Sequence, residues 1–137
     1  MRGSRRTCGR SMRAVDTNVL VRLATRDDPR QLAAAEAFIE PGAWVSVLAL
    51  AEAAWVLGST YDRDPRRISA ALQMMLDHKQ LFVQDYELVV AALELFHSRP
   101  ALGFADCLLI ETARSAGHLP FGTFDRDLAK VEGAVRL

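Results

Sequence analysis

Short apolar segments alternate with longer segments of helical periodicity throughout residues 12–137. The short segments have the length and composition of buried strands, and each is followed by apolar residues at the spacing of one helix face. Because parallel strands need a crossover between them, this alternation predicts an α/β domain, a parallel sheet with helices on both faces. The predicted strands cover residues 12–15, 43–47, 81–84, 119–123 and 134–137.

Capping residues mark the ends of the predicted helices. Asp28 is a candidate N-cap with Pro29 at the first helical position, and the same pair recurs at Asp64. Gly58 and Gly117 are each predicted to end a helix. The predicted helices cover residues 17–25, 28–40, 48–58, 64–78, 86–97 and 104–117, with a helical turn over 125–131.

The first eleven residues, MRGSRRTCGRS, differ in composition from the rest of the chain. They are basic and polar, and they lack the apolar core of a secretory signal. We expect them to be an expression leader or a misassigned start, with residues 12–137 forming a single domain that begins natively at Met12. They hold four of the 17 basic residues, so residues 12–137 carry 13 basic and 17 acidic residues, a net charge of −4. A basic surface is therefore not the organising feature of the domain.

The cysteines indicate a reducing compartment, and the histidines argue against a zinc site. The two cysteines, Cys8 and Cys107, lie in unrelated settings and do not form a disulfide framework. The three histidines are far apart in the sequence, and none has a second ligand at helical spacing. The longest apolar stretch, residues 44–57, is interrupted by Ser46 and Glu52 and is too short to span a bilayer. We therefore expect a cytoplasmic protein with no membrane association.

Two carboxylates stand out because they lie on apolar faces of predicted helices. The helical neighbours of Glu52 include Leu48 and Trp55, so Glu52 is expected in the middle of an apolar face. A carboxylate buried there must be wet, paired or bound to a metal, and an arginine salt bridge is the simplest alternative. Asp106 begins a helix whose same face is apolar. A favourable interaction with the helix dipole is an equally simple explanation for it.

Two further carboxylates follow predicted strands. Asp16 lies in AVDTN and Asp125 in GTFDRD, with Asp127 two residues later as an alternate. Either could simply be a helix N-cap. In a doubly wound sheet, however, functional residues gather outside the carboxyl ends of the strands, so these two acids are expected to meet Glu52 and Asp106 in one crevice.

Four clustered carboxylates repel each other unless they are protonated or bind a cation. Oxygen ligands without histidine favour Mg²⁺ or Mn²⁺ over zinc. The chain has no glycine-rich phosphate loop, which makes nucleotide binding by that route improbable. The pattern therefore favours hydrolysis of a phosphodiester by metal-activated water.

Four segments carry a family resemblance: VDTNVLVRLATRDD, VSVLALAEAAWVL, FADCLLIETA and TFDRDLAKV. In this order and spacing they resemble PIN-domain ribonucleases, and most closely the VapC-type toxins of prokaryotic toxin–antitoxin systems. The resemblance covers essentially all of residues 12–137. It implies a PIN-like three-layer sandwich with about five parallel strands and helices on both faces.

The resemblance also implies which residues act and on what. The catalytic and metal-binding quartet would be Asp16, Glu52, Asp106 and Asp125, supported by Asn18, Ser46, Thr123 and Asp127. For the small polar residues, capping or a strand-end hydrogen bond is an equally good explanation. Many relatives have a polar or acidic residue where this chain has Gly103, so a fifth acidic ligand is in doubt and a single-metal site is plausible. The implied cofactor is Mg²⁺ or Mn²⁺, and the implied partners are RNA, a second copy in a homodimer and a cognate VapB-type antitoxin.

Candidate RNA contacts and competing functions complete the predictions. Arg22, Arg26 and Arg126 lie near the motif acids, although an arginine solvated at the surface explains each equally simply. The alternative to a nuclease is a catalytically inactive PIN-like module that binds protein or RNA, and the complete quartet argues against it. A magnesium phosphotransfer fold ranks last, because DTN lacks the second aspartate that a haloacid-type phosphatase needs. The sequence leaves open the RNA target, one metal or two, and a toxin or a housekeeping role.

Overall fold

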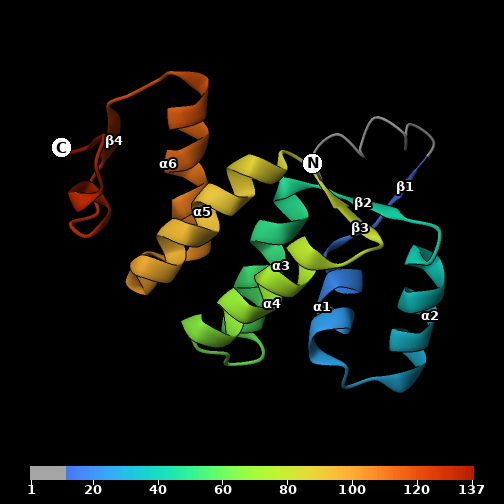
Figure 1. The fold of residues 1–137 in the computed structure, drawn as a ribbon. Helices are drawn as coiled ribbons and strands as arrows, with labels where there is room; N and C mark the ends of the chain where they lie inside the picture. Colours follow the sequence, from blue (N-terminus) through green and yellow to red (C-terminus); the bar gives the residue numbers. More distant parts are fainter. Residues whose placement is uncertain (1–11) are drawn as a thin grey trace.

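The computed structural model describes residues 12–137; the predicted leader and Cys8 lie outside the described residues. Within this range the chain forms an α/β domain, as predicted (Figure 1). The strands are β1 (Arg13–Ala14), β2 (Ala43–Val45), β3 (Leu81–Val83), β4 (Phe121–Thr123) and β5 (Ala134–Arg136). The helices are α1 (Thr17–Thr25), α2 (Pro29–Ile39), α3 (Val47–Ser59), α4 (Pro65–Asp77), α5 (Tyr86–Ser98) and α6 (Phe104–Ala116), with short 3-10 helices η2 (Pro100–Leu102) and η3 (Leu128–Lys130).

The predicted caps fix where most of the helices begin and end. Asp28 and Asp64 cap α2 and α4, each accepting a hydrogen bond from the backbone N–H three residues later, and a proline follows each of them. Gly117 ends α6 in the left-handed conformation with φ of 82°. These three predictions are confirmed.

The prediction that Gly58 ends its helix is wrong. The helix α3 includes Gly58 and continues to Ser59, and Thr60 is its C-cap. A β-carbon at Gly58 would lie 3.4 Å from Cδ1 of Ile68, an ordinary contact, and Gly58 does not adopt the left-handed conformation that ends α6 at Gly117.

One apolar core joins the helices to the sheet. In β2 and β3 the first and last residues of each strand are buried and the central residue is half-buried. The predicted inward stripe of α4 is buried at Ile68, Leu72, Met75 and Leu76. Packing of these faces supplies most of the stability, because strands of two or three residues make few hydrogen bonds.

All five strands pair in parallel, but they form two sheets. One sheet has the order β1-β2-β3, and Ala14, Trp44 and Phe82 lie in one row across it. The other contains β4 and β5, with Gly122 opposite Val135. The sequence pattern predicted a single sheet of about five strands, so the parallel pairing is as expected and the division into two sheets is not.

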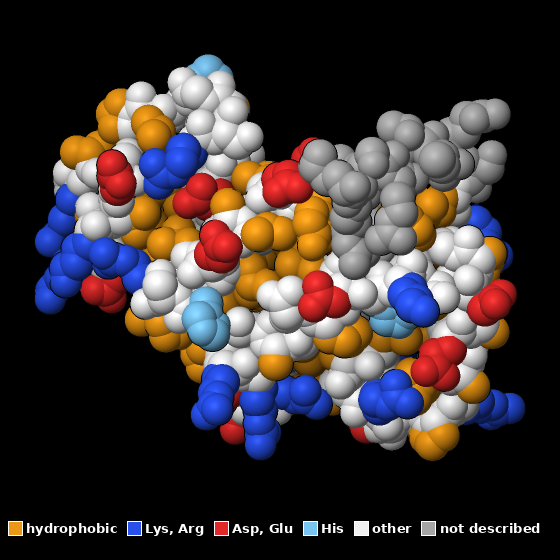
Figure 2. Space-filling model, viewed as in Figure 1, with side chains coloured by type: hydrophobic (Ala, Val, Ile, Leu, Met, Phe, Trp, Pro, Cys, Tyr) orange, Lys and Arg blue, Asp and Glu red, His pale blue; other side chains and the backbone are white. Residues whose placement is uncertain are grey.

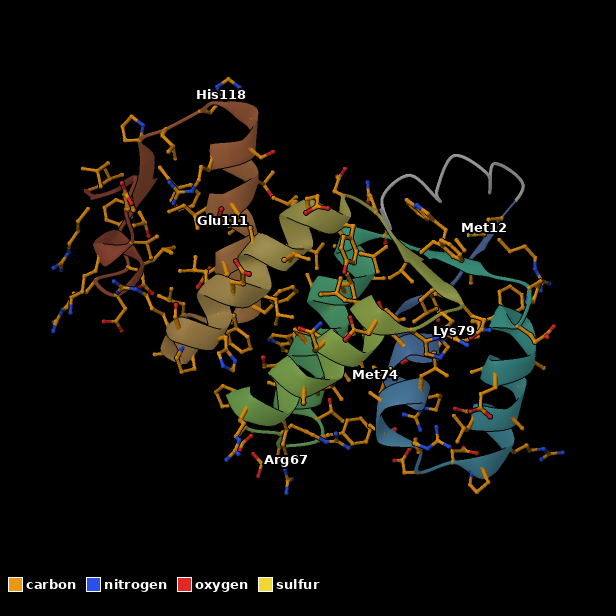
Figure 3. All side chains as sticks on the ribbon, in the orientation of Figure 1. Met12, Arg67, Met74, Lys79, Glu111 and His118 are labelled. Atoms are coloured by element: carbon orange, nitrogen blue, oxygen red, sulfur yellow. The ribbon has the colours of Figure 1, made fainter. Side chains whose placement is uncertain are left out.

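We call residues 121–137 the C-terminal lobe. Figure 1 shows this lobe beside α6, on the opposite side of the molecule from β1. Arg114 on α6 donates a 2.6 Å hydrogen bond from Nη2 to the backbone carbonyl of Glu132 and forms a 3.3 Å ion pair with Glu111. Glu111 is labelled on α6 in Figure 3. The hydrogen bond joins the lobe to α6, while the ion pair lies within α6 and helps to orient Arg114.

The caps give a first test of the fold. Replacing Asp64 by Ala removes the acceptor of the 2.9 Å hydrogen bond from Arg67 N, and we expect it to lower the free energy of unfolding by about 1 kcal/mol. Asp64→Asn keeps a capping oxygen and should change it by only a few tenths of a kcal/mol, on the order of the difference between good caps. Urea denaturation measures both. Equal stability of Asp64→Ala and wild type would contradict the capping role.

Candidate acidic site

Asp16 and Glu52 are brought together around Thr17. Asp16 follows the first strand in extended conformation and caps α1, its Oδ1 accepting a hydrogen bond from Val19 N at 3.2 Å. The hydroxyl of Thr17 donates to Oε1 of Glu52 across a 2.7 Å contact between α1 and α3. The capping explanation for Asp16 thus holds, and it does not use the second carboxylate oxygen. Thr17 was not predicted as a site residue, although its place beside Asp16 in DTN was a signal.

Glu52 lies on an apolar stripe, as predicted, but the stripe faces solvent. Glu52 is exposed, and its neighbours Leu48 and Trp55 are 68% and 71% exposed. Of the three situations expected for this carboxylate (wet, paired or bound to a metal), the structure shows a carboxylate exposed to water that also accepts the hydrogen bond of Thr17. The opposite face of α3, with Leu50 and Leu57 fully buried, supplies the core contacts of this helix.

Asp106 and Asp125 form a second acidic pair. Asp106 is half-buried in the first turn of α6, where it lines a cavity of about 440 Å³ between α3 and α6. Burial raises the pKa of this carboxyl, and the negative charge of Asp125 raises it further. The two acids are therefore electrostatically coupled through a site that is partly shielded from water.

Asp125 is oriented by the backbone around it. Its Oδ1 accepts hydrogen bonds from Asp127 N at 2.8 Å and Leu128 N at 2.9 Å, and its own N–H donates to Thr123 Oγ1 at 3.0 Å. This is the local capping geometry expected of an aspartate before a helical turn. Thr123 thus holds the backbone of Asp125, while the predicted alternate Asp127 is exposed and lies 3.9 Å from the ammonium of Lys130.

The four predicted acids lie in two pairs instead of one cluster. Within residues 12–137, no group of three or more histidine, cysteine or acidic side chains is close enough to share a metal ion. Asp16 and Glu52 meet through Thr17, and Asp106 is coupled to Asp125. The expected convergence in one crevice depends on β4 lying near β1, and those strands belong to different sheets. The catalytic and metal-binding roles of the four acids remain predictions.

The two remaining polar candidates differ in their surroundings. Ser46 caps α3, because its Oγ accepts a hydrogen bond from Ala49 N at 3.1 Å. The backbone N–H of Val47, the first residue of α3, donates to Oε1 of Gln84 at 2.8 Å. The side chain that follows β3 therefore provides an acceptor for a free N–H group of this helix. Asn18 is exposed and borders a surface depression between α1 and α2.

The three candidate arginines differ in how freely they can bind a ligand. Arg22 forms a 2.9 Å ion pair with Asp27 and donates to the hydroxyl of Tyr61. Arg26 lies 3.6 Å from Glu36 in an exposed pair. Arg126 is exposed next to Asp125. Arg22 is thus tied to the fold, and Arg126 is the best placed of the three for a ligand at the acidic pair.

Cys107 follows Asp106 but points into the core. Its side chain is fully buried, and burial together with the charges of Asp106 and Glu111 raises the pKa of the thiol to about 12. The thiol stays protonated near neutral pH, so it is no nucleophile.

Fold and acids together define an α/β domain of parallel strands with carboxylates at the strand ends and at the helix starts beside them. The family model of the PIN domain matches residues 13–134, and the chain belongs to the PIN-domain family. PIN domains are generally nucleases. Searches of curated proteins and of solved structures give no significant match. None of the helices in residues 12–137 combines the length and apolar character needed to cross a bilayer.

The raised pKa of Asp106, due first to burial and then to the charge of Asp125, predicts a pH-dependent stability. Because the carboxyl pKa of Asp106 is raised in the folded protein, its ionisation destabilises the fold as pH rises through that pKa, and the cost persists at neutral pH. Asp106→Asn should therefore raise Tm in chelator at about pH 7 and lose this gain below about pH 3.8, where the carboxyl is neutral in both states.

Thermal unfolding of Asp106→Asn at the two pH values measures the effect. The control is Asp62→Asn, an exposed acid outside both pairs. A gain in Tm that is the same at both pH values, or a loss at neutral pH, would contradict the raised pKa of Asp106.

Proposed function

We propose that this protein is a Mg²⁺-dependent endoribonuclease, and more particularly a VapC-type toxin. Membership of the PIN-domain family supports nuclease activity in general. The observation that carries the proposal is the arrangement of the acids in two pairs, with Asp16 and Asp125 after strands, Asp106 at a helix start and Glu52 within α3. Within residues 12–137, no histidine or thiolate joins them as a metal-binding group. Carboxylate oxygens suit Mg²⁺ or Mn²⁺.

The acids fit a magnesium ion in number and chemistry. Mg²⁺ keeps several waters and usually takes one or two carboxylates from the protein together with substrate phosphate oxygens. Either pair, Asp16 with Glu52 or Asp106 with Asp125, supplies that many. The raised pKa of Asp106 also marks a place where a cation would relieve repulsion. A bound Mg²⁺ would lower the pKa of water and neutralise charge that develops on the phosphate.

The chain's own contribution is to orient the carboxylates. One oxygen in each of three acids is held by an internal hydrogen bond: Oδ1 of Asp16, Oε1 of Glu52 and Oδ1 of Asp125. Among residues 12–137 the second oxygen of each makes no hydrogen bond. The held oxygen fixes the carboxylate plane and leaves the other as an acceptor. Preorganisation of this kind lowers the cost of binding a cation and its substrate.

The charge of the domain makes a cation important for RNA binding. Residues 12–137 carry a net charge of −4, so phosphate approaches against repulsion unless a cation or a local arginine offsets it. Arg126, exposed beside Asp125, is the arginine that we assign to the RNA backbone. Arg26 would contribute if it left its exposed pair with Glu36, and such pairs hold weakly.

The toxin assignment includes a protein partner. We propose that a VapB-type antitoxin covers the stripe of Leu48, Glu52 and Trp55 on α3. An acid between two exposed large apolar side chains suits an amphipathic segment that carries an arginine. A cytoplasmic location and a homodimer belong to the same proposal.

Cleavage of total cellular RNA tests the proposed activity. We expect discrete fragments with Mg²⁺ or Mn²⁺ and none in chelator. Asp16→Asn keeps a capping oxygen for α1 but removes a charge, so the fold should survive. Cleavage should fall by about 100-fold or more, because even changes beside metal ligands cost about 10–100-fold.

Asp28→Asn is the matched control, since it makes the same change at the cap of α2, away from the acidic pairs. It should cleave as wild type does. Equal cleavage by wild type and Asp16→Asn would contradict the assigned role of Asp16. RNA that is bound but left intact by the wild type would favour the inactive binding module.

A further inference from the structure

Four strands lie at the ends of the two sheets: β1 and β3 in one sheet, β4 and β5 in the other. Within residues 12–137, β1 pairs with β2 alone and β4 pairs with β5 alone. An unpaired edge of a sheet presents backbone N–H and C=O groups that can pair with another strand. The edges of β1 and β4 are therefore two places where another strand can add.

The lobe that carries β4 lies away from β1 of the same chain, and its strands form a sheet of their own. Leu128 and Val131 of the lobe are buried, and Arg114 on α6 binds the carbonyl of Glu132. The helix α6 in turn buries Phe104, Cys107 and Ile110 against the body of the domain. Figure 3 labels Met12, just before β1, and His118, where the chain leaves α6 for the lobe; they lie on opposite sides of the molecule. In Figure 2 the lobe lies on the left of the molecule.

The lobe also exposes apolar side chains that an isolated chain has no reason to leave in water. Phe124 is 79% exposed, Val135 44% and Leu137 69%. They account for three of the seven large hydrophobic side chains that are exposed in the described residues. Phe124 lies between Thr123 at the end of β4 and Asp125, so the apolar surface is continuous with the unpaired edge. Apolar surface at a strand edge marks a contact with another chain.

The acids show which strands belong together. Asp16 follows β1 and Asp125 follows β4, and parallel pairing of β1 with β4 brings the two carboxyl ends to one place. We propose that β4 of one chain pairs with β1 of a second copy, so that two copies exchange their C-terminal lobes. Each acidic site then takes Asp16 and Glu52 from one chain and Asp125 from the other. The shared site rests on the proposed function, whereas the strand pairing does not.

The exchange is reciprocal and closes on itself. Each copy offers one β1 edge and one β4 edge, so a two-fold dimer pairs both edges of both chains. Within the described residues of one chain the acids occur only as pairs, so one chain alone does not provide a site with all four. The second copy completes it and covers Phe124. Closure of the lobe onto its own β1 is the competing outcome, and it requires the contacts of Arg114 to break.

Cross-linking between two chains tests the pairing directly. In the proposed parallel pairing, a register that places Asp16 of one chain opposite Asp125 of the other also places Ala14 opposite Thr123. Gly122 is then the next residue along β4. Ala14 is exposed, and a β-carbon at Gly122 meets Leu137 Cδ1 at an ordinary 3.5 Å. One chain carries Ala14→Cys and the other Gly122→Cys, both with Cys8→Ser. Buried Cys107 stays as it is. The chains, with tags of different size, are co-expressed and treated with a short bismaleimide.

We expect a cross-linked heterodimer and a dimeric mass in solution. The control chain Thr60→Cys, exposed at the end of α3, replaces Gly122→Cys and should give no product with Ala14→Cys. A chain with both Ala14→Cys and Gly122→Cys that cross-links only within itself would overturn the exchange in favour of closure. A monomer without any cross-link would overturn the pairing altogether.

Complementation tests whether the exchanged lobes share a site. Asp16→Asn and Asp125→Asn each keep the oxygen that their local hydrogen bonds need, and each alone should be inactive on RNA. In a mixed dimer one site has both changes and the other has none. Random co-assembly makes half of the dimers mixed, so co-expressed chains should regain about one quarter of wild-type cleavage.

The two proposals fail in different ways. Cross-linking between chains together with wild-type protein that cleaves no RNA would end the nuclease proposal and leave the exchange standing. Active wild-type protein with cross-links only within one chain would end the exchange alone. Cross-linking between chains without complementation by active protein would overturn the shared site.

Discussion

Parallel pairing of very short strands is the constraint on which the rest of this structure depends. With two or three residues each, the strands contribute few hydrogen bonds, and each strand ends almost where a helix begins. The residue at that junction must satisfy the first free N–H groups of the helix, and a short acid or hydroxyl does so best. Asp16, Ser46 and Asp125 occupy such junctions. Acidic chemistry at the strand ends is therefore compatible with, and partly required by, the local architecture.

Local features of the fold could be predicted from the sequence because they depend on neighbouring residues. The caps at Asp28 and Asp64 and the stop at Gly117 follow from side chains and backbone conformations within a few positions. Gly58 misled the prediction because α3 continues one residue beyond it, to Ser59. The sequence placed Glu52 on an apolar stripe but did not show that this stripe faces solvent. An apolar stripe does not reveal whether its partner belongs to the same chain.

The candidate site shows the same division between local and distant information. The acids themselves were recognisable, because each interrupts an apolar pattern or follows a strand. Their arrangement in pairs was not, because it depends on the placement of β4 after a long helix. Thr17 escaped prediction since its contact with Glu52 joins residues 35 positions apart. The alternatives of capping and catalysis also proved compatible, because a carboxylate has two oxygens and a cap needs one.

The buried thiol of Cys107 bears on which metals the site would admit. Cysteine next to an acid could in principle recruit zinc or copper, since thiolate is the soft ligand that these ions prefer. Here the thiol has a pKa of about 12 and faces the core, so it offers no thiolate beside Asp106. Cys107 thus serves as a small side chain that packs in the core, and the adjacent acidic pair offers oxygen donors only. If the proposed metal site exists, the packing of α6 would by itself keep this thiol from recruiting a soft metal there.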